Sequence, residues 1–290
     1  MNTNQLNRQL AINYAILRKL VQDDAALHRL ITRDNLLTLL DIPAFYTAHF
    51  GSVNQVEFFP QIHALLHREV ESAFTKLKPR VRILNKFDDA YPKSIVRDLG
   101  LEAPLFIYVC GDSELFDRKV PKLSMIANTG YSDALIRHAL DAVEQFDGAS
   151  EALVLTQLCP LNSLIYRRIH ELHISSIVVV NHALDKTIFK STFYPCNQTK
   201  VKHMLVSAIG PEETNLKPYQ GLTDAMGAAL SKGGILMSQQ STDLRLEGCA
   251  RLMAAHKPVF VPFMSVPKHE LLIPVEAQAL RHTMDMLLNV

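Results

Sequence analysis

The sequence predicts an α/β fold, namely a doubly wound Rossmann-like parallel sheet preceded by a small all-helical N-terminal domain. Apolar residues recur at helical spacing as far as about residue 78, and from Arg80 onward short apolar runs alternate with segments of helical periodicity. Runs such as residues 176–180 are apolar on both faces, which is typical of strands in a parallel sheet that helices cover on both sides.

The N-terminal helical domain is expected to span residues 1–79. Apolar residues at helical spacing predict a first helix up to about Leu20, followed by a turn at Asp23 and Asp24. A second helix is expected over residues 25–40, a short third one that stops at Gly51, and a longer one over residues 55–78. Pro79 closes this last helix because proline cannot continue it.

The central domain is expected over residues 80–266, with a C-terminal helical tail over residues 267–290. The predicted strands cover residues 123–127, 152–156, 175–181, 204–209, 235–238 and 258–262, and residues 105–109 form a further buried apolar run. The predicted helices between them cover residues 132–146, 163–172, 219–231 and 244–256, and the tail is expected to hold one more, at about residues 275–288. Right-handed crossovers then place helices on both faces of the sheet.

Composition limits the classes of function. Hydrophobic residues make up 48% of the chain, which suits a packed core, and the net charge of +1 lacks the basic excess of many dedicated nucleic-acid binders, although a local basic patch can serve. No apolar run reaches the roughly 18 residues that a membrane span needs, and the N-terminus has no apolar signal core, so we expect a cytoplasmic protein. The four cysteines are widely spaced and are expected to be buried free thiols: Cys110, Cys159, Cys196 and Cys249.

One segment resembles a known family. Residues 87–112 read FDDAYPKSIVRDLGLEAPLFIYVCGD, which is similar to the lead-in to the Rossmann domain of the bacterial DNA-processing protein A family (DprA, also called Smf). That family carries D-x-x-Y-P-x-x-L, an apolar strand and then G-D. The resemblance continues to Pro262 through the closing strand that begins at Lys257-Pro258-Val259-Phe260. It identifies the chain as a divergent member with degenerate phosphate-binding motifs.

The departures from the family concentrate at ligand positions. Where the family has Gly-Ser-Arg after its first Rossmann strand, this chain has Ala127-Asn128-Thr129, and the next turn contains Pro160 and no glycine. Losing the arginine removes a bidentate contact to phosphate. Hydroxyl and amide groups that could still contact phosphate at strand ends and helix starts are Asn128, Thr129, Ser132, Ser241 and Thr242. The alternative is that these residues only cap helices.

A basic run lies where the helical domain meets the central domain. Its members could contact a phosphate backbone, together with two lysines later in the chain: Lys76, Lys78, Arg80, Arg82, Lys86, Lys200 and Lys202. The alternative is an ordinary solvated surface.

The resemblance implies a DprA-like protein that binds single-stranded DNA, assists recombinase loading and forms a homodimer, without catalysis and without a cofactor. A second hypothesis is a degenerate scaffold that binds other proteins and has lost the nucleic-acid pocket. A third is an enzyme or sensor acting on a small nucleotide. His182 follows a predicted strand, but no nucleophile stands beside it in the sequence, and His63 and His67 lack the further ligands of a metal site, so we expect neither a catalytic nor a metal site.

Overall fold

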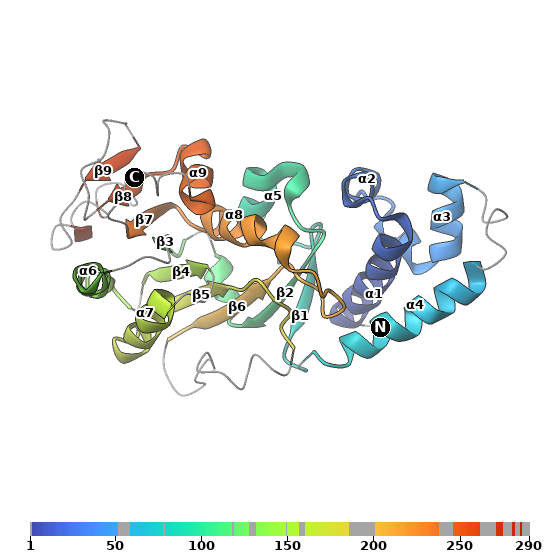
Figure 1. The fold of residues 1–290 in the computed structure, drawn as a ribbon, viewed down its shortest axis with the longest axis horizontal. Helices are drawn as coiled ribbons and strands as arrows, with labels where there is room; N and C mark the ends of the chain where they lie inside the picture. Colours follow the sequence, from blue (N-terminus) through green and yellow to red (C-terminus); the bar gives the residue numbers. More distant parts are fainter. Residues whose placement is uncertain are drawn as a thin grey trace.

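The structure is a computed structural model of the 290-residue chain. It describes residues 2–51, 59–77, 79–117, 119–127, 132–148, 150–156, 160–185, 201–237, 246–261, 271–274, 280–281 and 285. The chain begins with helices α1 (Thr3–Val21), α2 (Asp24–Leu30), α3 (Ile42–Phe50) and α4 (Phe59–Phe74), which lie together at one end of the molecule (Figure 1). The helical N-terminal segment that the sequence predicts is therefore present.

Side-chain caps set where these helices begin. The Asn2 side chain accepts a hydrogen bond from the Gln5 backbone N–H, and the Gln5 side chain accepts one from the Asn2 N–H, so α1 starts in a capping box. Asp23 and Asp41 cap α2 and α3 in the same way, each accepting a hydrogen bond from the backbone N–H three residues later. Helix α3 ends before Gly51, which has a φ of 99°, so the predicted glycine stop is confirmed.

The predicted helix over residues 25–40 is wrong in its second half. Helix α2 ends at Leu30, and a separate 3-10 helix (Leu36–Leu40) follows. Asn35 is the physical reason, because its side chain donates a hydrogen bond to the Leu30 carbonyl and accepts one from the Thr32 N–H, both at 2.8 Å. These bonds satisfy the Leu30 carbonyl and the Thr32 N–H, which a continued helix would otherwise pair within itself.

In the described part of the chain, nine strands form one sheet. The strands are β1 (Arg82–Asn85), β2 (Phe106–Gly111), β3 (Lys122–Ala127), β4 (Ala152–Thr156), β5 (Ser175–Val179), β6 (His203–Ser207), β7 (Gly233–Met237), β8 (Val259–Val261) and β9 (Leu272–Pro274). Their spatial order is β1-β2-β6-β5-β4-β3-β7-β8-β9. Strands β3 to β9 pair in parallel throughout, as the sequence predicts.

Two features of the sheet differ from the prediction. Strand β2 pairs antiparallel with both β1 and β6, so the sheet is mixed at this edge. Strand β9 lies in the segment predicted as a helical tail, and it adds to β8 in parallel. Strand β1 has only two apolar residues between Arg82 and Asn85, and β9 has only three residues, so neither gives the longer continuous apolar run of a buried parallel strand.

Helices cover both faces of the sheet, so the doubly wound α/β class is confirmed. Helices α5 (Lys93–Leu99), α8 (Gln220–Leu230) and α9 (Glu247–Ala254) lie on one side, while α6 (Asp133–Val143) and α7 (Pro160–Glu171) lie on the other (Figure 1). Helix α8 packs so closely on β4 that a Cβ added at Gly227 would come within 2.2 Å of Thr156 Cγ2.

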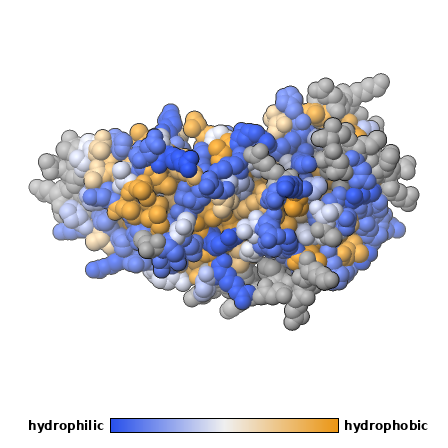
Figure 2. Space-filling model, turned by 180° about the vertical axis from the view of Figure 1, so that it is seen from behind, coloured by the Kyte–Doolittle hydropathy of each residue, from blue (hydrophilic) through white to orange (hydrophobic). Residues whose placement is uncertain are grey.

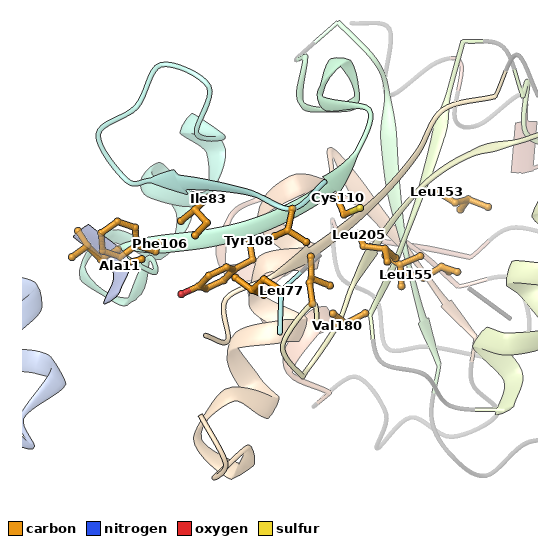
Figure 3. Close-up of a cluster of buried hydrophobic side chains, with 14 of the residues drawn as sticks. Ala11, Leu77, Ile83, Phe106, Tyr108, Cys110, Leu153, Leu155, Val180 and Leu205 are labelled. Carbon is orange, nitrogen blue, oxygen red and sulfur yellow. The ribbon is translucent and has the colours of Figure 1, made fainter. Parts of the chain in front are cut away.

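A continuous apolar core joins the N-terminal helices to the sheet. One cluster of buried side chains runs from Ala11 on α1 through Phe106 and Tyr108 on β2 to Leu205 on β6 and Leu155 on β4 (Figure 3). The domain limits drawn from the sequence stay a prediction, and this shared core is what fixes the helices against the sheet. Cys110 and Cys249 are buried free thiols as expected, whereas Cys159 and Cys196 lie outside the described residues.

The motif DDAYP has a structural role. Asp88 accepts hydrogen bonds from the Asn85 backbone N–H and from the Asn7 side chain, and Asn7 also donates to the Ile83 carbonyl. Tyr91 is buried, and its hydroxyl donates to the Pro104 carbonyl at 2.8 Å. These residues therefore attach α1 to β1 and close the loop that leads into β2.

Candidate nucleic-acid interface

The strand order of the sheet reverses at β3, because β4 to β6 are added on one side of it and β7 to β9 on the other. Strand β4 lies on one side of β3 and β7 on the other, and Ala127 pairs with Met237 at their carboxyl ends. In open α/β sheets, ligands bind at this position because the connections leave in opposite directions and open a crevice. We call the described residues at the carboxyl ends of these strands, with the described helix turns beside them, the carboxyl-edge crevice.

Four of the predicted phosphate contacts follow the two paired strand ends directly. Asn128 and Thr129 come immediately after β3, and Ser241 and Thr242 come a few residues after β7, but all four lie outside the described residues. Ser132 is described, and its hydroxyl caps α6 by accepting a hydrogen bond from the Leu135 N–H at 3.3 Å. The structure thus gives Ser132 a helix-capping contact.

Carboxyl groups occupy the described part of this crevice, and sequence reasoning missed them. Asp224 lies in the second turn of α8 and hydrogen-bonds Thr156 at the end of β4. Burial raises the pKa of the Asp224 carboxyl, and the nearby Glu247 carboxylate at the start of α9 adds to that rise. Each residue lies in the first half of a helix that follows a parallel strand, which is the sequence signal that could have found them. Carboxylates here disfavour a phosphate group by like-charge repulsion.

Some side chains of the basic run form hydrogen bonds or ion pairs with other described residues, and others form none. Lys76 and Arg80 are exposed and Arg82 is half-buried, and their side chains make no hydrogen bond or ion pair with any other described residue. They lie between the end of α4 and the start of β1, where Leu77 bridges to Asp185. Lys78, within the same run, lies outside the described residues.

The other predicted cations already have partners where they are described. Lys86 donates from Nζ to the Gly100 carbonyl at 2.9 Å, and burial lowers the pKa of its ammonium. Lys202 pairs with Glu114, while Lys200 lies outside the described residues.

The sheet also separates Lys86 from Lys202. Strands β1 and β6 run in the same direction, because each is antiparallel to β2. Lys86 follows the carboxyl end of β1, whereas Lys202 precedes the amino end of β6. These two lysines therefore lie at opposite ends of the strands. Of the predicted cations that the structure describes, only Lys76, Arg80 and Arg82 have no partner among the described residues, and they are neighbours in the chain.

Another basic residue of the family-like framework has a structural contact. Lys257 is buried at the start of the closing strand, and its Nζ contacts Asp98 Oδ2 at 2.7 Å and the Ala228 carbonyl at 2.8 Å. The bond ties the end of α8 to α5 and to the segment before β8. These contacts explain structurally why a lysine stands at the start of this family-like segment: it holds neighbouring elements of the fold together.

The histidines singled out in the sequence form no catalytic or metal arrangement in the described part of the chain. His63 and His67 have ring centroids 6.1 Å apart on α4, and no group of three or more ligating side chains among the described residues could hold a metal ion. His182 follows β5, and burial lowers the pKa of its imidazole. None of the helices that the structure describes combines the length and apolar character needed to cross a bilayer.

Comparisons with known proteins give a match in fold alone. No family model and no curated protein sequence matches the chain. The structure of DNA processing protein A (DprA) from Streptococcus pneumoniae matches with a TM-score of 0.53 and 17% identity, covering 97% of this chain and 88% of that one. A structure of DNA processing protein A from Helicobacter pylori, described by its single-stranded DNA binding mode, gives a TM-score of 0.49 and 17% identity over 72% of this chain and 96% of that one. The molybdenum cofactor carrier protein from Chlamydomonas reinhardtii gives 0.39 and 10% identity over 59% of this chain and 99% of that one.

Proposed function

We propose that this chain, which has the fold of DNA processing protein A, is a DprA-like DNA-processing protein that binds single-stranded DNA without catalysis. The observation that carries the proposal is the match to the Streptococcus pneumoniae DprA structure over 97% of the chain, which includes the N-terminal helices as well as the sheet. The independent resemblance of residues 87–112 to the lead-in of the same family adds to it. Assistance to recombinase loading and a homodimer belong to the same proposal.

The basic run supplies the physical means of binding. Lys76, Arg80 and Arg82 have no carboxylate partners in the described part of the chain, so no ion pair must break before they contact phosphates. Cations of this kind release counterions from a nucleic acid, and that release gives binding its strong dependence on salt. Because the run adjoins the edge strand β1, a bound strand of DNA would lie along the surface at that edge of the sheet.

Binding of a fluorescent oligo-dT strand, measured by anisotropy at several salt concentrations, tests the proposal. We expect the double variant Arg80→Glu/Arg82→Glu to weaken binding by at least roughly tenfold and to lower the salt slope by about 1.4, which corresponds to two lost single-strand phosphate contacts. The control is Arg137→Glu/Lys217→Glu, which makes the same charge change at exposed positions on α6 and before α8. Equal effects of the two double variants would mean that only net charge matters and would contradict a defined interface.

A second candidate function is a scaffold that binds other proteins. Asp224 and Glu247 in the carboxyl-edge crevice favour it, because carboxyl groups there oppose a phosphate ligand. Absence of oligo-dT binding even at low salt would exclude the DNA-binding proposal and leave the scaffold. Affinity capture with the purified chain as bait would then be the next measurement.

A further inference from the structure

A cavity of about 380 Å³ lies between the N-terminal helices and the sheet. Helices α1 and α2, the segment that leads from Leu101 into β2, the segment after β6 and the start of α8 at Leu222 line it. Neither the crevice carboxyls Asp224 and Glu247 nor any residue of the basic run is among its lining residues. Its volume falls within the roughly 300–1,000 Å³ of small-molecule sites. Apolar side chains gather most densely on the same half of the molecule, the half that carries the N-terminal helices, in the rear view of Figure 2.

Aromatic rings line this cavity. Tyr14 of α1 and Phe106 of β2 have ring centroids 5.6 Å apart, and the ring centroid of His28 on α2 lies 6.3 Å from that of Tyr14. Phe106 and Tyr108 project to the side of β2 on which Ala11 lies (Figure 3). The Nδ1 atom of His28 donates to the Leu101 carbonyl at 2.9 Å, which fixes the orientation of its ring. Such walls favour a flat aromatic ligand.

Three polar groups that face the cavity have no hydrogen-bond partner in the described part of the chain. The Oε2 atom of Glu212 is buried and accepts no hydrogen bond. The hydroxyl groups of Tyr14 and Tyr108 likewise make none. Native proteins rarely leave a buried polar atom unpaired, so Glu212 Oε2 indicates that a ligand supplies its partner, and the two tyrosine hydroxyls line the same cavity.

The cations and carboxylates around the cavity are largely paired with one another. Arg18 pairs with Asp24 at 2.6 Å and with Glu213 at 3.3 Å, and its guanidinium lies over the rings of Tyr14 and Tyr219. Its charge is therefore already neutralised. Glu102, which also lines the cavity, pairs with Arg251 at 2.7 Å, and Arg29 and His28 are the remaining basic residues of the lining. The Glu212 carboxyl has no such partner among the described residues, so an anionic ligand would lie beside it, which favours an uncharged ligand.

We propose that this cavity binds a flat, uncharged heteroaromatic molecule with neighbouring N–H donors, of the purine nucleoside class. Glu212 Oε2 accepts a hydrogen bond from an N–H on the edge of the ring, and the hydroxyls of Tyr14 and Tyr108 donate to its acceptors. The rings of Tyr14 and Phe106, which contact each other, form one apolar wall against which the ligand packs. The site is separate from the DNA interface proposed above and does not depend on it.

Isothermal titration of the full chain with guanosine tests the proposal, because guanosine presents two neighbouring N–H donors on one edge of its base. We expect a dissociation constant of roughly tens of micromolar, as suits a ligand of this size. Guanosine 5′-monophosphate should bind at least about tenfold more weakly, because the arginines nearest the cavity are already paired with Asp24 and Glu102 and do not compensate the desolvation of its phosphate. Adenosine and cytidine complete the panel. Binding of adenosine in place of guanosine, with the same sensitivity to the variants below, also supports the proposal, whereas binding of cytidine in preference to both purines would contradict it.

Three variants locate the binding. We expect Glu212→Leu to weaken guanosine binding more than tenfold and Tyr14→Phe to weaken it about fivefold. Glu171→Gln, an exposed change on α7 far from the cavity, should leave it unchanged. Circular dichroism of each variant establishes folding, and Tyr14→Phe keeps the test decisive if Glu212→Leu fails to fold. No binding of any nucleoside at about 1 mM, or binding that neither cavity variant changes, would overturn the proposal.

Oligo-dT anisotropy separates this site from the DNA interface. We expect saturating guanosine to leave oligo-dT binding unchanged, and Arg80→Glu/Arg82→Glu to leave guanosine binding unchanged. Competition between guanosine and the oligonucleotide for one site would instead assign the cavity to a base of the bound strand and overturn a separate nucleoside site.

Discussion

Replacement of Glu212 by glutamine is predicted to remove a pH dependence of stability from this protein. Burial, opposed by the nearby Arg18 charge, raises the pKa of the Glu212 carboxyl from an ordinary 4.5 to about 7. In the unfolded chain this carboxyl ionises in water, whereas in the folded chain it must ionise in a buried site. Folding therefore favours the protonated form of Glu212.

The sign and size follow from linkage. Because the folded pKa lies above the unfolded one, the stabilising contribution is fully present below the unfolded pKa and is lost as pH rises through about 7. A shift from 4.5 to about 7, at about 1.4 kcal/mol for each pH unit, corresponds to about 3 kcal/mol. Relative to the wild type, Glu212→Gln should gain about 3 kcal/mol in free energy of unfolding between pH 5 and pH 8.

Urea unfolding of both proteins at several pH values between about 5 and 8 measures this difference directly. Other groups titrate in this range, but they are common to the two proteins and cancel in the comparison. Glu69→Gln is the matched control, because the Glu69 side chain is 58% exposed and pairs only with Lys19 at the surface. Its effect should stay within about 0.5 kcal/mol at every pH. A Glu212→Gln difference that does not change with pH would refute the reasoning.

Three further substitutions should destabilise the fold, and urea unfolding measures each of them. Gly227→Ala should cost about 1–3 kcal/mol, because the new Cβ would come within 2.2 Å of Thr156 Cγ2 and Thr156 is held by its hydrogen bond to α8. Tyr91→Phe should cost about 1–2 kcal/mol, because the Pro104 carbonyl loses its buried hydrogen-bond donor. Asn35→Ala should cost about 1 kcal/mol, because the two bonds that terminate α2 are lost.

Matched controls exist for two of these changes within the same chain. Gly221 lies on the same helix as Gly227, but an added Cβ there meets nothing closer than Glu247 Cγ at 3.8 Å, so Gly221→Ala should be neutral or stabilising by up to about 1 kcal/mol. Tyr14→Phe removes a hydroxyl that has no hydrogen bond to a described residue, so it should cost less than about 0.5 kcal/mol without ligand. An Asn35→Ala variant as stable as the wild type would show that packing alone ends α2.

The parallel part of the sheet could be predicted because its signal is local. Strands β4 and β5 are continuous apolar runs, and the helices between strands carry their own periodicity and caps. Strand β1 escaped prediction because Arg82 and Asn85 flank only two apolar residues, and its pairing with β2 supplies what its own sequence lacks. The broken second helix escaped because the hydrogen bonds of the Asn35 side chain, which no periodicity reveals, end α2.

The candidate sites depend more heavily on tertiary structure. The sequence placed Lys76, Arg80 and Arg82 together because they are neighbours in the chain. It could not show that Lys86 and Lys202 have partners, or that they lie at opposite ends of the strands. The crevice carboxyls of Asp224 and Glu247 come from different helices.

The sequence by itself determined the fold class of this protein, because alternation of apolar strands and amphipathic helices is a property of each segment in turn. The cavity was decided only by the tertiary structure. Arg18 and Glu213, which form one ion pair at its edge, stand 195 positions apart in the chain. Burial of Glu212 exists only once α1 packs beside β2 and the segment after β6, because desolvation is a property of the assembled surroundings and not of any one segment.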